Sequence, residues 1–477
     1  MKILHWFRKD LRLDDNTALS EAARDAADGV VPFYVSEPAI LSRPDIAPAR
    51  VRFVLEALAA LDTDLRARGT SLALAHGDAA ACVLAAVRTC GADAVYWNDE
   101  YEPALRARDE AVERALNTAG VRVRRFHDRL IVPPGAVGTQ TGGPYMVYTP
   151  FRRACEALPV SSPFPSPVRF APHALPTPPL ATLERLGFAP PDSAPWPAGE
   201  RAAHARLRAF VEGAGADAPG LAGYAAGRDV PALAATSRLS ADLKFGTIGI
   251  RRVLAEVGAS DPARHAEVEK YMSELRWRDF YSHVLWHFPH VEHGAFRRAY
   301  DALRWQGGVE HLAAWCSGCT GYPIVDAGMR ELRATGFMHN RVRMIVASFL
   351  TKDLLLDWRH GERHFMRHLL DGDLANNNGG WQWAAGTGAD AAPWFRIFNP
   401  VTQGRRFDPA GAYVRRWCPE LARVPDECVH APWEAPPLLL AAGGVTLGES
   451  YPAPLVEHAE QRERALAMYR EVRDAEA

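Results

Sequence analysis

The hydrophobic pattern of this chain changes near its middle, and that change restricts the possible folds more than any other feature. From Ile3 to Phe126, short β-rich runs such as ILHWF and VVPFYV alternate with longer amphipathic stretches such as ARVRFVLEALAALDTDLRARG. This alternation predicts a doubly wound parallel sheet of about five strands with helices on both faces. Ligands commonly bind at the carboxyl ends of the strands in such a sheet.

Prolines end this pattern. Residues 158–200 contain LPVSSPFPSPVRFAPHALPTPPL and APPDSAPWPAGE. Proline lacks a backbone N–H and has a fixed φ, so these stretches are excluded from helices and central strands. We predict a long connector that packs along the surface, because a free linker would more often be rich in Gly and Ser.

After Arg201 the periodicity is helical in segments such as RHAEVEKYMSELRWRDFYSHVLWHF, YPIVDAGMRELRATG and RVRMIVASFLTKDLLLDW. The expected fold is therefore α/β plus all-α. At 477 residues the chain also exceeds what one core usually serves. We expect an α/β domain at residues 1–130, a connector at 131–200 and a helical domain at 201–477.

Composition restricts the partners that the chain could bind and the cellular compartment in which we expect it. The formal net charge is −2, so a nucleic-acid partner would have to meet a local basic patch. The N-terminus MKILHWFRKDLRLDD lacks a secretory pattern, and no apolar run is long enough to span a membrane. Seven scattered cysteines indicate reduced thiols and a cytoplasmic protein. The CSGC at 316–319 has no second pair of ligands nearby, so we expect free thiols and no metal.

The stretch DGDLANNNGGWQW, residues 371–383, is difficult to explain by packing. A solvated loop would account for its Asn and Gly residues, but not for Trp381 and Trp383. A flat ligand with polar edges would account for both. Ten of the thirteen tryptophans lie in the helical half, where a large aromatic core is the simpler explanation for any single one.

Two further segments carry groups suited to an anionic ligand. TSRLS at 236–240 offers hydroxyls and a guanidinium for phosphate, although Ser and Thr are also ordinary helix caps. In GFMHNRVRM at 336–344, Asn340, Arg343 and Met344 would lie close together on a helix. Buried arginines need partners, and we expect Asp371 and Asp373, either as a structural ion pair or beneath a ligand.

Together these stretches resemble the photolyase/cryptochrome family, and the whole chain is most similar to bacterial class I photolyases for cyclobutane pyrimidine dimers. The resemblance rests on WFRKDLRLDDN, TSRLS, ELRWRDFY, TGYPIVDAGMREL, FMHNRVRM, DGDLANNNGGWQWAAGTG and RIFNPVTQG. It implies an N-terminal antenna domain and a C-terminal helical domain that binds FAD in a U-shape. It also implies light-driven repair, in which excited, fully reduced FAD donates an electron to a flipped-out dimer.

The resemblance assigns residues to three tasks. Asn377 would face flavin N5, and an electron relay would run through Trp381, Trp358 and Trp305. The other FAD contacts would be Tyr224, Thr236, Ser237, Arg238, Leu239, Ser240, Asn340, Arg343, Asp371 and Asp373. Contacts to damaged DNA would be Arg228, Glu274, Trp277, Arg278, Asn340, Arg341, Met344 and Trp383, with the two tryptophans stacking on the dimer and Glu274 bonding a pyrimidine edge.

The identity of the antenna chromophore is suggested by a difference between this sequence and one subgroup of the family. Folate-binding relatives carry an Asn-Glu pair where this chain has Ala104 and Leu105. The segments around Arg50, Glu100 and Lys244 look more like the subgroup that binds 8-hydroxy-5-deazaflavin, although Glu100 stands where that subgroup has Asp. A reduced folate, or an empty pocket, is the alternative.

Two other functions share the same resemblance. One is a cryptochrome-type blue-light receptor without repair activity. The other is repair of (6-4) photoproducts, which usually requires a histidine in the substrate pocket; His339 and His283 are present, but the motifs around them do not resemble that subgroup. We expect a monomer whose partner is UV-damaged DNA, bound mainly through its phosphates.

Overall fold

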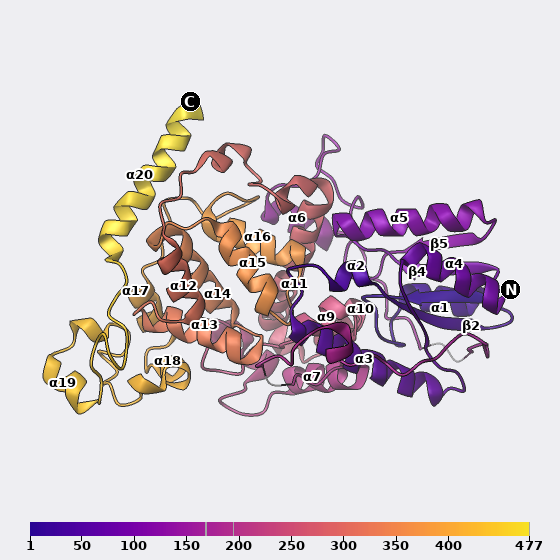
Figure 1. Cartoon of the computed structure of the whole chain (residues 1–477), viewed down its shortest axis with the longest axis horizontal. Coiled ribbons are helices and arrows are strands. Elements are labelled where there is room, and N and C mark those ends of the chain that lie inside the picture. Colours follow the sequence, from indigo (N-terminus) through magenta and orange to yellow (C-terminus); the bar gives the residue numbers. More distant parts are fainter. Residues whose placement is uncertain (167–168, 194, 477) are drawn as a thin grey trace.

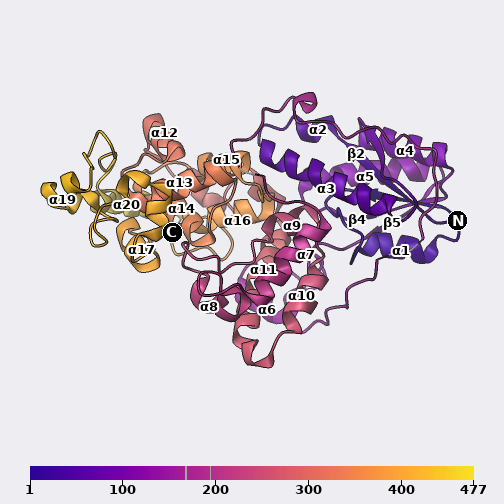
Figure 2. The ribbon, with the colours of Figure 1, turned by 90° about the horizontal axis from the view of Figure 1, so that it is seen from below.

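The computed structural model describes residues 1–166, 169–193 and 195–476, and it contains an α/β domain and a helical domain (Figure 1). Residues 167, 168 and 194 of the expected connector and residue 477 lie outside the described residues. The α/β domain lies at one end of the molecule. The last helices of the helical domain lie at the other end (Figures 1 and 2).

All five strands of the α/β domain are parallel, as predicted, in the order β3-β2-β1-β4-β5. Side chains alternate between the two faces of β1: Leu4 and Trp6 pack with α4 and α5, whereas Ile3 and Phe7 pack with α1 and α3. The strands are β1 (Ile3–Phe7), β2 (Val30–Ser36), β3 (Ala73–His76), β4 (Ala94–Asn98) and β5 (Arg122–Phe126), and the helices are α1 (Thr17–Asp25), α2 (Pro38–Leu41), α3 (Pro48–Arg66), α4 (Ala79–Cys90) and α5 (Pro103–Thr118).

The helical domain packs around one large core with several smaller clusters beside it. The described residues of this domain form fourteen α-helices, and those at 265–287, 323–335, 340–348 and 358–368 match periodic segments of the sequence. They are α7 (Glu200–Glu212), α8 (Tyr224–Gly227), α9 (Ser240–Phe245), α10 (Ile250–Gly258), α11 (His265–His287), α12 (Val309–Ser317), α13 (Pro323–Thr335), α14 (Asn340–Ser348), α15 (Trp358–His368), α16 (Leu374–Ala385), α17 (Pro400–Phe407), α18 (Ala412–Trp417), α19 (Pro437–Ala442) and α20 (His458–Glu476).

The Asn- and Gly-rich stretch forms a helix, α16. Asp373 caps its N-terminus by accepting the backbone N–H of Asn376 at 3.1 Å, which offsets the low helix propensity of the Asn and Gly residues that follow. Gly379 is required because a Cβ there would come within 2.1 Å of the Tyr281 ring on α11. Helix α14 does not run on to Trp358 as its sequence suggested, because a π-helical turn at Phe349–Asp353 ends it.

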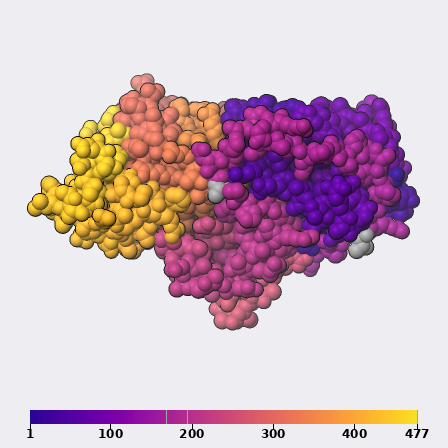
Figure 3. Space-filling model, turned by 60° about the horizontal axis from the view of Figure 1, so that its bottom comes forward, coloured from indigo at the N-terminus to yellow at the C-terminus, as the bar shows by residue number. Residues whose placement is uncertain are grey.

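The connector lies along the α/β domain instead of crossing free space (Figure 3). Its backbone pairs with β2 through an isolated bridge between Val30 and Phe170, and Leu74 of β3 donates its N–H to Pro176 at 3.1 Å. Before this proline-rich part, the connector contains α6 (Tyr148–Glu156), which packs against α11. The connector therefore contacts both domains.

A buried ionic cluster joins the two domains. Asp128, at the end of the α/β domain, pairs with Arg12 at 2.6 Å and with Arg251 of α10 at 2.7 Å. Burial alone would raise the pKa of Asp128, but the two guanidiniums reverse this and hold its pKa well below the usual range. Arg251 also bonds Asp15 at 2.7 Å. The cluster fixes α10 against the loop that follows β1.

Among the residues that the structure describes, no helix is both long enough and apolar enough to cross a bilayer. Each of the seven cysteines is a free thiol.

Candidate functional site

Helix α11 brings Glu274 and Trp277 to one side of the helical domain. The carboxylate of Glu274 pairs with Arg228, at the end of α8, and lies 3.5 Å from the ammonium of Lys270. Trp277 is half-buried and packs edge-on against Phe280, with ring centroids 5.6 Å apart. A carboxylate paired with a guanidinium thus lies one helical turn from an indole, and the contact of these groups with a lesion stays a prediction.

Arg278 does not join this cluster. Its guanidinium donates to the carbonyl oxygens of Arg129 at 2.6 Å and Leu243 at 3.1 Å, at the junction with the α/β domain. Burial lowers the pKa of Arg278. A helix places successive residues about 100° apart, so the neighbour of Trp277 in the sequence points away from it. Its predicted contact with DNA is the one the structure supports least.

Helix α14 contributes the next group of predicted residues. Asn340 is exposed, and its amide lies 3.9 Å from the sulfur of Met344, as the helical spacing predicts. Arg343 pairs with Asp371 at 2.9 Å, so one of the two expected ion pairs is present. Arg341 instead pairs with Asp229 at 2.9 Å, a carboxylate that follows α8 and that the sequence did not single out.

Asp373, the other expected partner, faces the α/β domain. It lies 3.4 Å from Arg129 and 3.8 Å from Lys244 while capping α16. Burial would raise the pKa of Asp373, but these cations and Lys9 hold it far below the usual range. The carboxylate is therefore charged and already bonded to other groups of the protein. We infer that it contributes to ligand binding mainly by stabilising α16, the helix that it caps.

The loop at 236–240 approaches the same region. Arg238 has a left-handed φ of 52°, which is uncommon for a residue other than glycine and indicates a specific conformational demand. Its guanidinium lies 5.1 Å from the Phe337 ring, over which Arg343 also lies at 5.6 Å. Ser237 accepts a hydrogen bond from the Tyr271 hydroxyl at 2.9 Å, and Tyr271 packs edge-on against Tyr224 at 5.2 Å. Leu239 precedes α9 without a side-chain cap, so simple capping does not explain Ser240.

One face of α16 is open beside these groups. Gly380 lies between Asn377 and Trp383, each three residues away and about 60° from it around the helix. A Cβ at Gly380 would meet no atom within 4 Å, so there is room for a flat group over this position. The amide of Asn377 donates to the backbone oxygen of Glu362 at 3.0 Å and to its carboxyl at 3.1 Å. Burial raises the pKa of that carboxyl to about 7.

The three relay tryptophans lie on neighbouring segments. Trp381 and Trp358 are each 2% exposed, and Trp305 is half-buried. A Cβ at Gly361 of α15 would come within 2.1 Å of the Trp381 indole, so α15 and α16 pack closely there. Gln306, the residue after Trp305, donates its backbone N–H to the carbonyl of Leu355 at 3.0 Å. Leu355 precedes Trp358 by three residues. Two of the three indoles are thus buried and the third is half-buried, and their service as a relay stays a prediction.

Arg50, Glu100 and Lys244 all line one cavity of about 450 Å³. It opens where β2 and β3 end, and the helical domain closes it with Phe245, Met366 and Gly372. Burial lowers the pKa of Lys244 to about 8 and that of Arg50 to about 10. The sequence did not single out Lys9, Glu37, Glu102 or Arg108, which also line the cavity. Lys9, Glu37 and Glu102 follow strands or begin helices, which is the usual place for ligand contacts in such a sheet.

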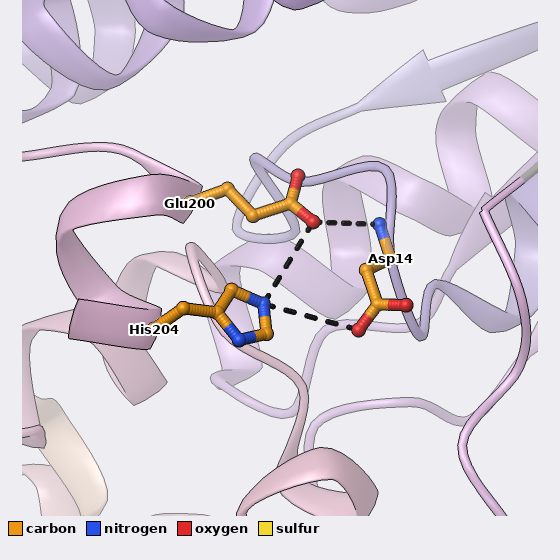
Figure 4. Close-up of side chains that lie close together, drawn as sticks. All are labelled: Asp14, Glu200 and His204. Carbon is orange, nitrogen blue, oxygen red and sulfur yellow. Dashed lines mark hydrogen bonds and ion pairs between the residues drawn. The ribbon is translucent and has the colours of Figure 1, made fainter. Parts of the chain in front are cut away.

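Asp14, Glu200 and His204 form the one group of potential metal ligands found among the described residues (Figure 4). The imidazole Nε2 lies 3.9 Å from each carboxylate. The oxygens of Glu200 accept the backbone N–H groups of Leu13 and Asp14 at 2.8 and 2.9 Å. Asp14 is held by Arg252 at 2.9 Å. Because these oxygens are already bonded, the group is best explained as a contact between the β1–α1 loop and α7.

The fold and the site define a class. A sheet-based domain with a cavity at its strand ends, joined to a helical domain with an open position on α16 and buried indoles on α15 and α16, is the architecture of a flavin-binding photolyase. Two family models agree: that for DNA photolyase matches residues 3–169, and that for the FAD binding domain of DNA photolyase matches residues 271–471. The chain belongs to the DNA photolyase family.

Individual relatives extend the match to the whole chain. A deoxyribodipyrimidine photo-lyase from Agrobacterium fabrum is 43% identical, over 99% of this chain and 98% of the relative. The crystal structure of a bacterial class III photolyase from Agrobacterium tumefaciens superposes with a TM-score of 0.91 at 41% identity, covering 99% and 98% of the two chains. An archaeal photolyase from Sulfolobus tokodaii, solved with two FAD molecules, gives 0.82 at 32% identity, covering 99% of this chain and all of the other. Membership of class I therefore remains a prediction.

Proposed function

We propose that the protein is a DNA photolyase that repairs cyclobutane pyrimidine dimers with light. One observation carries the proposal: Glu274 pairs with Arg228 one turn before Trp277 on α11, and Trp383 lies three residues after the open position Gly380 on α16. This combination offers stacking surfaces and hydrogen-bonding groups to a flat, polar lesion. The full-length similarity to deoxyribodipyrimidine photo-lyases supports it.

The described residues fit FAD. The open space over Gly380, the left-handed Arg238 loop and the Arg343–Asp371 pair supply a cradle, hydroxyls and charges. When bound and fully reduced, FAD supplies the excited electron donor. The residues that would hold it are Tyr224, Thr236, Ser237, Arg238, Leu239, Ser240, Asn340, Arg343, Asp371, Asp373 and Asn377.

The protein's own side chains bind and orient the lesion. Trp277 and Trp383 stack on the flipped dimer, and Glu274, held by Arg228, accepts hydrogen bonds from a pyrimidine edge. Arg341, Asn340 and Met344 extend the contact surface from α14. Photolyases are among the enzymes that act on a flipped-out nucleotide, and flipping costs about a few kcal/mol, less for a lesion that has already lost its pairing.

Trp381, Trp358 and Trp305 restore the active redox state. They would pass electrons one at a time from a reductant at the surface toward the flavin, because an indole can be oxidised and can be buried without charge. Arg359 lies over the Trp358 ring at 4.9 Å, so a positive charge on that indole would be disfavoured by the guanidinium.

The partner is UV-damaged DNA, bound by a monomer in the cytoplasm. With a net charge of −2, the protein would meet phosphates through a local cluster of arginines. Arg341 and Arg406 of α17 lie over the Phe407 ring, at 4.3 and 5.0 Å.

The cavity lined by Arg50, Glu100 and Lys244 would hold the antenna chromophore. Its charged lining and its apolar floor suit 8-hydroxy-5-deazaflavin, and the absence of the Asn-Glu pair at 104–105 argues against folate. A flavin at this place, or an empty cavity, is the alternative; the Sulfolobus relative contains two FAD molecules. Pigments extracted from the purified protein test this, and folate as the sole antenna pigment would contradict it.

The function is tested by absorbance. The protein with reduced flavin is mixed with DNA bearing one thymine cyclobutane dimer and illuminated with blue light, and the absorbance at about 260 nm rises as the bases regain their aromaticity. We expect a light-dependent rise that is lost in Trp277→Ala and Glu274→Ala. No rise, despite bound and reducible FAD, would favour a blue-light receptor, and a rise only on (6-4) lesions would identify the other repair reaction.

A further inference from the structure

Trp277 has one of its faces covered. The ring of Tyr148 lies against it with centroids 3.7 Å apart and an interplanar angle of 11°, a stacked arrangement. Phe280 and Tyr281 approach from other directions, at 5.6 Å each. A base can therefore stack on Trp277 only from the side opposite Tyr148.

Tyr148 is itself fixed at both ends. Its hydroxyl donates to the Ser273 carbonyl at 2.6 Å and lies 2.9 Å from the Ser273 hydroxyl. Ser273 precedes Trp277 by four residues on α11, so one side chain spans one turn of the helix beside Glu274. Tyr148 as a whole residue is 7% exposed, and its burial raises the pKa of the phenol to about 12.

The backbone of Tyr148 reaches a second part of the site. Its N–H donates to the Asp390 carboxylate at 3.0 Å, and Asp390 has a left-handed φ of 47°. Two residues later, Ala392 donates its N–H to the carbonyl of Trp383 at 3.2 Å. Tyr148 therefore connects α11, which carries Trp277, with the loop bonded back to Trp383.

We propose that Tyr148, in the connector, is a positioning residue for the lesion: it fixes the ring of Trp277 and its spacing from Trp383. This inference rests on the proposed function. The connector then has a task in recognition besides joining the domains, because a tilted or displaced Trp277 ring would lose face-to-face overlap with the dimer.

The position of α6 supports this task. Arg276, next to Trp277, pairs with Glu156 at the end of α6 at 3.1 Å, so both ends of that helix are tied to α11. Stacked aromatic pairs contribute beyond the area they bury, and their energies correspond to about a two- to twelve-fold change in an equilibrium constant. That range sets the expected effect on affinity for damaged DNA.

The test compares Tyr148→Ala and Tyr148→Phe for binding to DNA with one thymine dimer and to the same undamaged duplex. Tyr148→Ala should weaken binding of the dimer about two- to twelve-fold and leave undamaged DNA unaffected. Tyr148→Phe keeps the ring and loses only the hydroxyl bonds to Ser273, so its loss should be smaller.

A double-mutant cycle separates positioning from a direct contact or a folding defect. If Tyr148 acts through Trp277, Tyr148→Ala should have no further effect on dimer binding in a Trp277→Ala background. An equal loss in both backgrounds, or an equal loss on undamaged DNA, would overturn the proposal. The FAD absorbance spectrum and the Tm of Tyr148→Phe show that the fold is intact.

Failure of the proposed function has a different outcome. A wild-type protein that binds dimer and undamaged DNA equally would refute dimer repair and, with it, the role of Tyr148 in recognition. Near-UV circular dichroism reports the stack without DNA: an unchanged aromatic signal in Tyr148→Ala would show that the ring does not order Trp277, whatever the substrate.

Discussion

The amide of Asn377 donates a hydrogen bond to the carboxyl of Glu362 at 3.1 Å, across the contact between α16 and α15. Burial raises the pKa of this carboxyl to about 7, and the bond from Asn377 lowers it only in part. The carboxyl of Glu362 is thus mostly protonated below about pH 7 and becomes charged above that pH.

The raised pKa predicts a pH-dependent stability. A carboxyl whose pKa is higher in the folded protein stabilises the fold fully below its unfolded value of 4.5, and this contribution is lost as pH rises through about 7. The Tm of the wild type, relative to Glu362→Gln, should therefore be higher at pH 5 than at pH 8. Other buried acids cancel in this difference. The same difference at both pH values would show that the Glu362 pKa is not raised.

Trp381→Phe should lose most of the light-driven reduction of oxidised flavin, because the innermost donor of the relay is replaced by a ring that is harder to oxidise. Trp433→Phe is the control, since Trp433 packs against Tyr322 in the same domain. The measurement follows the loss of oxidised-flavin absorbance under blue light with an external reductant. Equal rates in the two variants would remove Trp381 from the relay.

Trp277→Ala should weaken binding to dimer-containing DNA about 5- to 150-fold, since stacking on an aromatic side chain is worth about 1–3 kcal/mol per base. Binding to undamaged DNA should change little, because phosphate contacts dominate there. The two affinities are compared at one salt concentration. An equal loss on both DNAs would indicate a general defect in place of a lost lesion contact.

Ala75→Trp should exclude the antenna chromophore and leave FAD bound. Ala75 lies on β3 and lines the cavity at the strand ends, so an indole there fills the space without touching α16. The variant should lose antenna absorbance after purification or reconstitution while its repair under direct flavin excitation is retained. Antenna pigment still bound in full would place the chromophore elsewhere.

Asp128→Asn should lower the free energy of unfolding by about 3–5 kcal/mol, because it leaves Arg12 and Arg251 buried without their shared carboxylate. The wild-type pKa is depressed, so the contribution of Asp128 is present above its unfolded value of 3.8 and is lost as pH falls further. Denaturant unfolding measures the change. Asp474→Asn, which removes an exposed partner of Arg473, is the control and should have little effect.

The sequence predicts the fold where periodicity is strong. The five strands and α11 follow directly from their patterns, because alternating and three-to-four spacing report burial. Helix α16 was not predicted, because Asn376, Asn377 and Gly379 have low helix propensity and only the cap at Asp373 and packing on Tyr281 stabilise it.

The site was predicted less completely than the fold. Resemblance and spacing identified the Arg343–Asp371 pair, and the structure contains it. The pairing of Arg341 with Asp229 depends on two segments that are distant in the sequence and share no pattern. Tyr148 was overlooked for a similar reason: it stands in a segment interpreted as a connector, and only tertiary packing brings it to Trp277.

The cavity at the strand ends belongs to no single domain. Strands β2 and β3 provide one side, the connector provides Pro178 and Leu180, and the helical domain closes it with Lys244 and Met366. Light harvesting is therefore not a transplantable module in this protein. A chimera that received residues 1–130 from a relative would receive only part of the pigment site. The cavity residues of its own connector and helical domain would have to be redesigned as well.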